Sequence, residues 1–338
     1  MPQDPILKDY TLQIVSKIAV PGAPSALKAM PLASPNVFLA TTMSDENKVA
    51  ILKSGMASLI SEIQVGNGPF DVSRGSGVLA YVACRDDRTL DVIDRKARVA
   101  RIDLPGTPYG LAWNGMFKRG KSRLLVACER ANQKYGMLCV IDEETREIVN
   151  TLQVGRNPRG IGLDRHHRFL FVANCGDDSI SIIDQSGTHV LGTVPTAGRP
   201  IGVNNSWADK DHIIVSLDSG GVLQRVDASR QPPELSGLTA LRRDNPAQSA
   251  LLPSCCVSLG QDDLWVVPDR FSQSIALVVS SEKTFEQIDC FDLSDGRDDS
   301  HGFGELAIAT PGLPGRFYVA NTKRHELLLV RLEKHRLR

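Results

Sequence analysis

The sequence predicts an all-β protein, a seven-bladed β-propeller of four-stranded antiparallel blades that is closed by an N-terminal strand pairing in the last blade. The first observation is a recurring unit, in which a strand ending in a small residue is followed by a polar loop and a second strand. The second is its period of 43 to 53 residues, measured between Ala40, Ala83, Ala127, Ala173, Ser216, Val267 and Ala320. The third is a G-x-x-P type loop before most copies. Four strands per repeat at this period are typical of a propeller.

The clearest copy occupies residues 154–198 and contains four short apolar runs, at 159–163, 169–173, 179–184 and 189–194. The third run alternates Ile with polar residues, which is the period of a half-buried strand. Asp, Asn, Gly and Ser fill the segments between the runs, and these residues favour turns. One such sheet cannot bury both of its faces, so it needs neighbouring repeats.

We therefore expect one domain over residues 1–338. The repeat cores lie near residues 21–62, 63–104, 105–153, 154–196, 197–245, 246–293 and 294–338, the last completed by residues 10–20. The last repeat shows only three strands before the chain ends, and TLQIVSKIAV near the start has strand character but no repeat of its own. Pairing the two closes the ring, which removes exposed sheet edges.

One irregularity interrupts the repeats, the segment RQPPELSGLTALRRDNPAQSA from Arg230. Its two prolines and its RRD run favour a loop excursion over a strand pair, either as a plain surface loop or as a flap over one face. A pair of histidines, His166 and His167, falls in the turn between the first two strands of the fourth repeat. We interpret it as a solvated turn on the face opposite the G-x-x-P loops, with a metal site as the alternative.

The repeat FVANCGDDSISIID, together with VGRNP before it, resembles the YVTN-type β-propeller repeat. That repeat is seen in archaeal surface-layer proteins, YncE-like bacterial proteins and the propeller of cytochrome-type nitrite reductase, and the 6-phosphogluconolactonase propellers are similar. The resemblance covers nearly the whole chain and implies the propeller fold. It carries over no catalytic motif residue by residue. A cofactor role like that of the nitrite reductase propeller would need axial histidines, for which His301 and His325 are the candidates.

Composition excludes some classes of partner. Lys plus Arg and Asp plus Glu both number 39, so the formal net charge is +0. This balance removes the usual electrostatic basis for binding nucleic acid or an anionic membrane. No apolar run reaches the length of a membrane span. We expect a monomer whose partner is a protein or a small molecule.

The N-terminus has no secretory pattern, because charged and polar residues interrupt every candidate apolar core. The expected location is therefore cytoplasmic, unless a leader has been removed. The seven cysteines do not stand at zinc-type spacing, and we expect free thiols in a reducing compartment. Cys255 and Cys256 are adjacent and are the first suspects for a disulfide.

The candidate site lies at the mouth of the central channel, on the face of the G-x-x-P loops, where the innermost strand of each blade begins. Most repeats carry small or apolar residues there, as close packing around an axis requires. Four residues depart from this pattern and form the candidate ligand-binding set: Asp71, Arg159, His301 and Glu305. Asp71 and Glu305 are candidate ligands of a divalent cation or a general base, Arg159 is a candidate anion clamp, and His301 is a proton carrier or ligand. The alternative is a structural cluster of ion pairs around the axis.

Around this mouth we expect an outer rim of mixed charge. Its predicted members are Arg85, Glu129, Arg130, Asn174, Asp269, Arg270, Arg324 and His325. Mixed sign favours polar recognition over a trap for substrates of one charge.

Two function classes follow. The first is a binding or scaffold propeller that recognises a partner protein or a small ligand at the polar mouth. The alternative is a lactonase-like hydrolase or a lyase acting at the same mouth, with or without a divalent metal. The sequence decides neither the ligand nor whether the protein is an enzyme.

Overall fold

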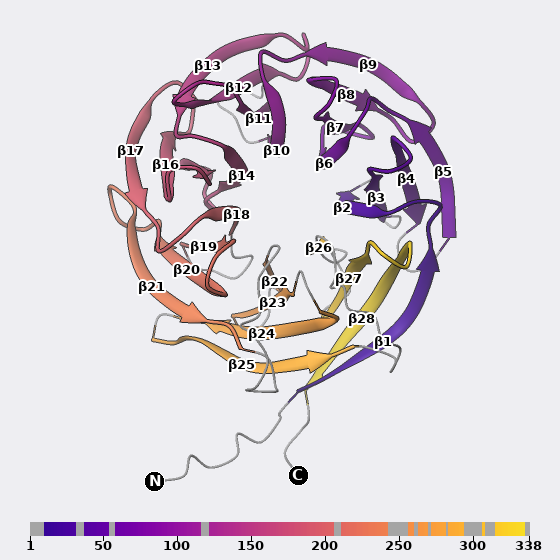
Figure 1. Ribbon diagram of the computed structural model, residues 1–338, viewed down its shortest axis with the longest axis vertical. Coiled ribbons are helices and arrows are strands. Elements are labelled where there is room, and N and C mark those ends of the chain that lie inside the picture. The colour runs from indigo at the N-terminus through magenta and orange to yellow at the C-terminus, as the bar shows by residue number, and fades with distance from the viewer. Residues whose placement is uncertain are drawn as a thin grey trace.

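The protein is a ring of seven four-stranded antiparallel sheets, a seven-bladed β-propeller, in the computed structural model (Figure 1). The structure describes residues 10–31, 37–53, 58–115, 122–205, 211–242, 256–259, 263–269, 272–281, 283–293, 306–307 and 315–334. The fold class predicted from the repeat is confirmed.

Each blade contributes one strand to each of four concentric positions. The innermost strands are β2 (Pro24–Pro31), β6 (Pro69–Arg74), β10 (Thr107–Asn114), β14 (Pro158–Leu163), β18 (Pro200–Asn205), β22 (Val257–Ser258) and β26 (Leu306–Ala307). The second strands are β3 (Val37–Met43), β7 (Ala80–Cys84), β11 (Arg123–Glu129), β15 (Phe169–Asn174), β19 (His212–Leu217), β23 (Leu264–Pro268) and β27 (Arg316–Asn321). The third strands are β4 (Lys48–Lys53), β8 (Thr89–Ile93), β12 (Gly136–Asp142), β16 (Ser179–Asp184), β20 (Val222–Asp227), β24 (Ser274–Ser280) and β28 (Glu326–Lys334). The outermost strands are β5 (Ser58–Gln64), β9 (Arg98–Asp103), β13 (Ile148–Val154), β17 (Val190–Pro195), β21 (Glu234–Ala240), β25 (Phe285–Asp292) and β1 (Tyr10–Ala19).

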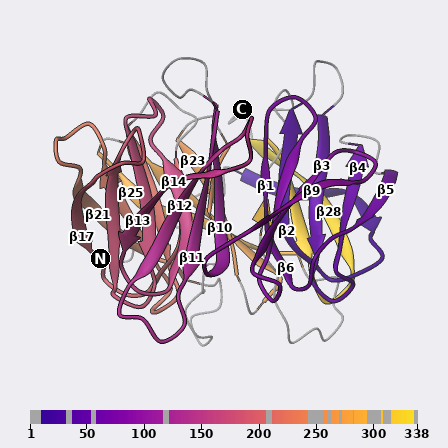
Figure 2. The ribbon, with the colours of Figure 1, turned by 90° about the horizontal axis from the view of Figure 1, so that it is seen from above.

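The chain runs from the innermost strand outwards in each of the first six blades. The loops between blades and the loops between second and third strands therefore lie on one face, and the remaining turns lie on the other. Figure 2 shows the ring from the side, with the loops gathered at two opposite faces. The G-x-x-P loops and the loops that follow the V-A strand ends are thus brought together, as the repeat predicts.

The ring closes through β1, which pairs with β28 in the last blade from Tyr10↔Lys334 to Ala19↔Glu326. Residues alternate in exposure along β1, and Ile18 packs in one apolar cluster with Tyr318 and Leu327. The predicted closure by the N-terminal strand is confirmed.

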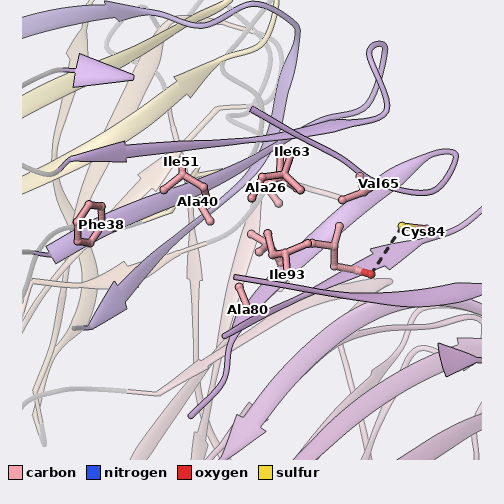
Figure 3. Packing of buried hydrophobic residues seen from close by; sticks show 12 residues of the cluster. Ala26, Phe38, Ala40, Ile51, Ile63, Val65, Ala80, Cys84 and Ile93 are labelled. Atoms are coloured by element: carbon pink, nitrogen blue, oxygen red, sulfur yellow. Dashed lines mark hydrogen bonds between the residues drawn. The ribbon is translucent and has the colours of Figure 1, made fainter. Parts of the chain in front are cut away.

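The core lies between neighbouring blades. Second and third strands are buried on both faces and are rich in apolar residues, although some third strands also bury polar side chains such as Asp91 and Gln224. The outermost strands alternate and show one face to solvent. Figure 3 shows Ala40, Ile51 and Ile63 of the first blade packed with Ala80 and Ile93 of the second. Each blade is buried by its neighbours, which explains why a single repeat cannot fold alone.

The expectation for the segment after Arg230 is wrong in part. Glu234–Ala240 is β21, the outermost strand of the fifth blade, which pairs with β20 from Val222↔Ala240 to Asp227↔Glu234. Pro232 and Pro233 precede this strand and do not interrupt its hydrogen bonding. An outermost strand needs apolar residues on only one face, so ELSGLTA suffices.

The six cysteines within the described residues are free and buried: Cys84, Cys128, Cys139, Cys175, Cys256 and Cys290. Cys255 lies outside the described residues. The thiol of Cys84 points at the carbonyl of Val82 at 3.7 Å, inside the cluster of Figure 3. Burial raises the pKa of Cys84 to about 12, so this thiol stays protonated at neutral pH.

Candidate functional site

A β-bulge opens the innermost strand of five blades. The pairing with the second strand shifts directly after the proline, between Pro24 and Leu27, Pro69 and Asp71, Pro108 and Leu111, Pro158 and Ile161, and Pro200 and Gly202. A bulged residue is left out of the ladder and its side chain is re-aimed. The residues directly after the prolines are half-buried, and we call them the axial mouth: Ser25, Phe70, Tyr109, Arg159 and Ile201. These are the slots that the sequence comparison of repeats places around the axis.

Glycine follows the mouth residue where neighbouring inner strands touch. A Cβ on Gly110 would lie 1.9 Å from the carbonyl oxygen of Arg159, and one on Gly160 would lie 2.7 Å from that of Ile201. Backbone atoms cannot yield as a flexible side chain can, so no side chain fits at these positions. The close approach fixes Tyr109 and Arg159 side by side on adjacent blades.

Asp71 stands in the second blade at the position that Gly110 and Gly160 hold in the third and fourth blades. Its carboxylate accepts hydrogen bonds from the backbone N–H groups of Val72 and Leu111, both at 2.8 Å. The second bond joins two blades across the mouth. Burial raises the pKa of Asp71, opposed by the positive charge of Lys28. Asp71 lines the central channel, so its side chain is half-exposed although protein atoms surround it on most sides.

The structural alternative, a cluster of ion pairs around the axis, would pair Arg159 with Asp71. The structure shows no such pair among the described residues. Its guanidinium carbon lies 3.5 Å from the ring centroid of Tyr109, and its NH2 nitrogen lies 3.7 Å from an oxygen of Glu129. Both the guanidinium and the Glu129 side chain are about a quarter to a third exposed. A cation stacked on an aromatic face is held by the ring quadrupole. Arg159 is therefore fixed in orientation at the surface of the mouth.

Arg85 lies over the same aromatic pair. Phe70 and Tyr109 meet edge to face at 5.3 Å, and the guanidinium carbon of Arg85 lies 5.1 Å from each ring centroid. The Nε of Arg85 is buried and has no hydrogen-bond partner among the described residues. Two guanidiniums thus flank two aromatic rings, with the single carboxylate of Glu129 beside them. We call Phe70, Arg85, Tyr109, Glu129 and Arg159 the stacked cluster.

Some of the predicted rim residues lie on the face of the mouth, and others are buried. Arg130 stacks on Tyr135 at 5.4 Å, and the Nε2 atom of His325 lies 3.9 Å from a carboxylate oxygen of Asp45, with both side chains exposed. The backbone N–H of Arg324 donates to the side chain of Asn321 at 3.2 Å. These side chains lie on the face of the mouth, together with Arg85 and Glu129.

Asn174 and Asp269 are not part of the exposed rim, because both are fully buried. The Asn174 amide donates to the hydroxyls of Ser179 and Ser181, at 3.2 and 2.9 Å, and Asp269 accepts from Ser272 at 2.5 Å. Each holds its own loop in place, as short polar side chains next to turns commonly do.

His301, Glu305 and Arg270 lie outside the described residues, so their place in the candidate site stays a prediction. Within the described ranges, no group of three or more His, Cys, Asp or Glu side chains is arranged to hold a metal ion. Of the two acidic residues predicted as metal ligands, Asp71 already uses both carboxylate oxygens as acceptors for backbone N–H groups.

Phe70 and Tyr109 were not among the candidate residues that the sequence predicted. The sequence carries a partial signal, because aromatic residues follow the proline in the second and third blades, whereas Arg159 comes from the fourth repeat and is brought to Tyr109 only by the fold. Stacking of arginine on such rings is a recurring mode of packing and recognition.

Comparison with known proteins shows the fold. No family model matches this chain, and no curated protein matches it. Among solved structures, a streptogramin B lyase is similar at a TM-score of 0.67 and 14% identity, covering 98% of this chain and 100% of that chain. U3-55K is similar at 0.71 and 12%, covering 95% and 98%. The hydrazine synthase of Kuenenia stuttgartiensis is similar at 0.63 and 17%, covering 80% and 87%. At such identities the likeness shows a shared propeller and nothing about activity.

Within the part of the chain that the structure describes, no helix is long and apolar enough to span a membrane.

Proposed function

We propose that this propeller is a binding protein whose axial mouth recognises a planar anionic group, carried by a small ligand or presented by a partner protein. The observation that carries the proposal is the stacked cluster. Arg85 and Arg159 lie against the rings of Phe70 and Tyr109 at the axial mouth.

The charges of the cluster favour an anion. Glu129 is the one acidic partner of Arg159 among the described residues, and Arg85 has none there. Guanidinium groups present paired N–H donors that match the two oxygens of a carboxylate. The guanidinium planes, which are themselves stacked on the rings, can also stack on a planar group next to that carboxylate.

The predicted members of the site fit this proposal in different ways. Arg159 is the anion clamp. Asp71 holds the mouth together through Leu111, and His301 and Glu305 are proposed to complete the mouth from the seventh blade. The other rim side chains surround the cluster and would contact a larger ligand or a protein.

The test uses benzoate as the probe and cyclohexanecarboxylate as its non-planar counterpart, titrated by calorimetry. We expect benzoate to bind several-fold more tightly than cyclohexanecarboxylate, and Arg85→Gln or Arg159→Gln to weaken benzoate binding at least tenfold. Arg156→Gln is the matched control, because Arg156 lies on the same face, is exposed and pairs with Asp177 away from the rings. Equal affinity in all three variants, or no binding of benzoate by the unaltered protein, would contradict the proposal.

A second candidate is a hydrolase or lyase acting at the same mouth. It is favoured by the raised pKa of Asp71, because a carboxylate shifted toward neutral pH suits a general base. Hydrolysis of δ-valerolactone, followed by acid release, discriminates between the two. A rate above that of buffer which is lost in Asp71→Asn would favour the enzyme, and a rate equal to that of buffer would leave the binding function.

A further inference from the structure

A second cluster lies at the opposite end of the ring axis from the mouth. The innermost strands run in the same direction, so β6 and β10, which are neighbours around the axis in Figure 1, end together on the far face. There the guanidinium carbon of Arg74 lies 4.6 Å from the ring centroid of Trp113. Both residues are half-buried.

The indole of Trp113 is fixed from several sides. Its Nε1 donates to Glu143 at 2.8 Å, and Glu143 also accepts from the backbone N–H and the hydroxyl of Ser76, at 2.6 and 2.7 Å. A Cβ on Gly115 would lie 2.0 Å from the six-membered ring of Trp113, so only glycine leaves room for this orientation. The result is a rigid aromatic platform beneath Arg74.

The N–H groups of Arg74 have no acceptor among the described residues, and no carboxylate there lies within ion-pair distance. Arg225 offers the contrast. Burial lowers the pKa of both guanidiniums, but Arg225 donates to the hydroxyl of Ser236 at 3.1 Å and to the carbonyls of Ser281 and Thr284. A partly desolvated guanidinium normally finds such partners. Arg74 keeps its donors open.

His167 lies next to this platform, and the carboxylate of Glu143 there is engaged by Trp113 and Ser76. His167 lies in the turn after β14, and its Nδ1 is 3.1 Å from the side-chain oxygen of Asn114, the residue after Trp113. Burial lowers the pKa of His167. The negative charge of Asp164 opposes this effect, and the positive charge of Arg74 adds to it. Asp164 is itself neutralised by Arg168 at 2.9 Å. The predicted solvated turn is therefore half-buried at His167 and belongs to this cluster.

We propose that Arg74, held on the Trp113 platform with His167 beside it, binds an oxyanion on the face opposite the mouth. The ligand is a carboxylate or a phosphate group, since either presents two oxygens that match the edge of a guanidinium. The site is separate from the stacked cluster and does not depend on the function proposed for it.

The indole N–H of Trp113 is a direct reporter of this site. The chain has 3 tryptophans, so a protein labelled with nitrogen-15 in its indoles gives three signals, and Trp113→Phe assigns one of them. Sodium phosphate and sodium acetate are titrated separately against sodium chloride of equal ionic strength. We expect the Trp113 signal to move saturably with phosphate, with acetate or with both, and not with chloride. Movement with phosphate alone identifies a phosphoryl ligand, and movement with acetate identifies a carboxylate.

The variants locate the binding. Arg74→Gln should weaken it at least tenfold, whereas Arg156→Gln and Arg85→Gln, which remove the same charge from the other face, should change it less than twofold. If Arg74→Gln fails to fold, Arg74→Lys keeps the charge, removes the paired donors and should weaken binding several-fold. A Trp113 signal that moves no more with either oxyanion than with chloride would overturn the proposal. So would unchanged affinity in the folded Arg74 variant.

Discussion

Single residues at the bulge decide which side chains the mouth presents. The residue after the proline is free of the ladder, so its identity is set by neither strand pairing nor core packing. Serine or isoleucine there leaves a plain surface, whereas Phe70, Tyr109 and Arg159 build the stacked cluster. The next residue must be glycine wherever a neighbouring backbone lies against it, as at Gly110.

Asp71 stands where glycine would be expected, and substituting it tests how much its carboxylate contributes to stability. Asp71→Ala leaves the N–H of Leu111 without its acceptor, which should cost about 1–3 kcal/mol of unfolding free energy. The stability that Asp71 contributes also depends on pH. Burial raises its folded pKa above 3.8, so this contribution is full below 3.8 and is lost as pH rises through the folded pKa. Urea unfolding at several pH values measures both effects.

The comparison with Asp71→Asn isolates the titration, because asparagine keeps one acceptor oxygen and does not ionise. The stability of the unaltered protein relative to Asp71→Asn should rise as pH falls from 7 toward 4. A difference that is constant over this range would show that the Asp71 carboxylate titrates alike in folded and unfolded chains.

Strands and their pairing were largely readable from the sequence. The four runs of the fourth repeat correspond to β14–β17, because second and third strands are buried on both faces and outer strands on one. The segment of β21 was misread because prolines next to a short, weakly apolar strand resemble a loop. The bulges left no sequence signal beyond the proline, since a one-residue shift in pairing depends on the neighbouring strand.

The N-terminal strand provides a test of closure at the scale of one element. Removing residues 1–20 deletes β1, exposes the edge of β28 and takes Ile18 out of its cluster. Burying one such side chain is worth about 1.5–3 kcal/mol, and Leu12 and Ile14 also pack against the core of the last blade. We expect the melting temperature to fall by roughly 10 °C or more.

The control deletion removes residues 1–9 and keeps β1 whole, so it should leave the melting temperature nearly unchanged. Melting of the longer deletion within a degree or two of the full-length protein would mean that the ring does not need β1.

At the scale of the whole molecule, the ring separates two axial faces, and each face carries its own arginine–aromatic cluster. The mouth carries the stacked cluster with Glu129, and the far face carries Arg74 on Trp113. The sequence predicted the mouth because every repeat contributes an equivalent slot to it. It did not predict Arg85 on Phe70 and Tyr109, or Arg74 on Trp113, because those contacts join adjacent blades and depend on side-chain orientation around the axis.

The central claim is that the axial mouth binds a planar anionic group, and a crystal structure of the protein with benzoate tests it most directly. We expect benzoate at the stacked cluster, with its carboxylate within hydrogen-bond distance of the guanidinium of Arg85 or Arg159. The same crystals grown from Arg159→Gln should show weaker density or none. A mouth without benzoate, in crystals grown at a concentration that saturates the calorimetric titration, would contradict the account.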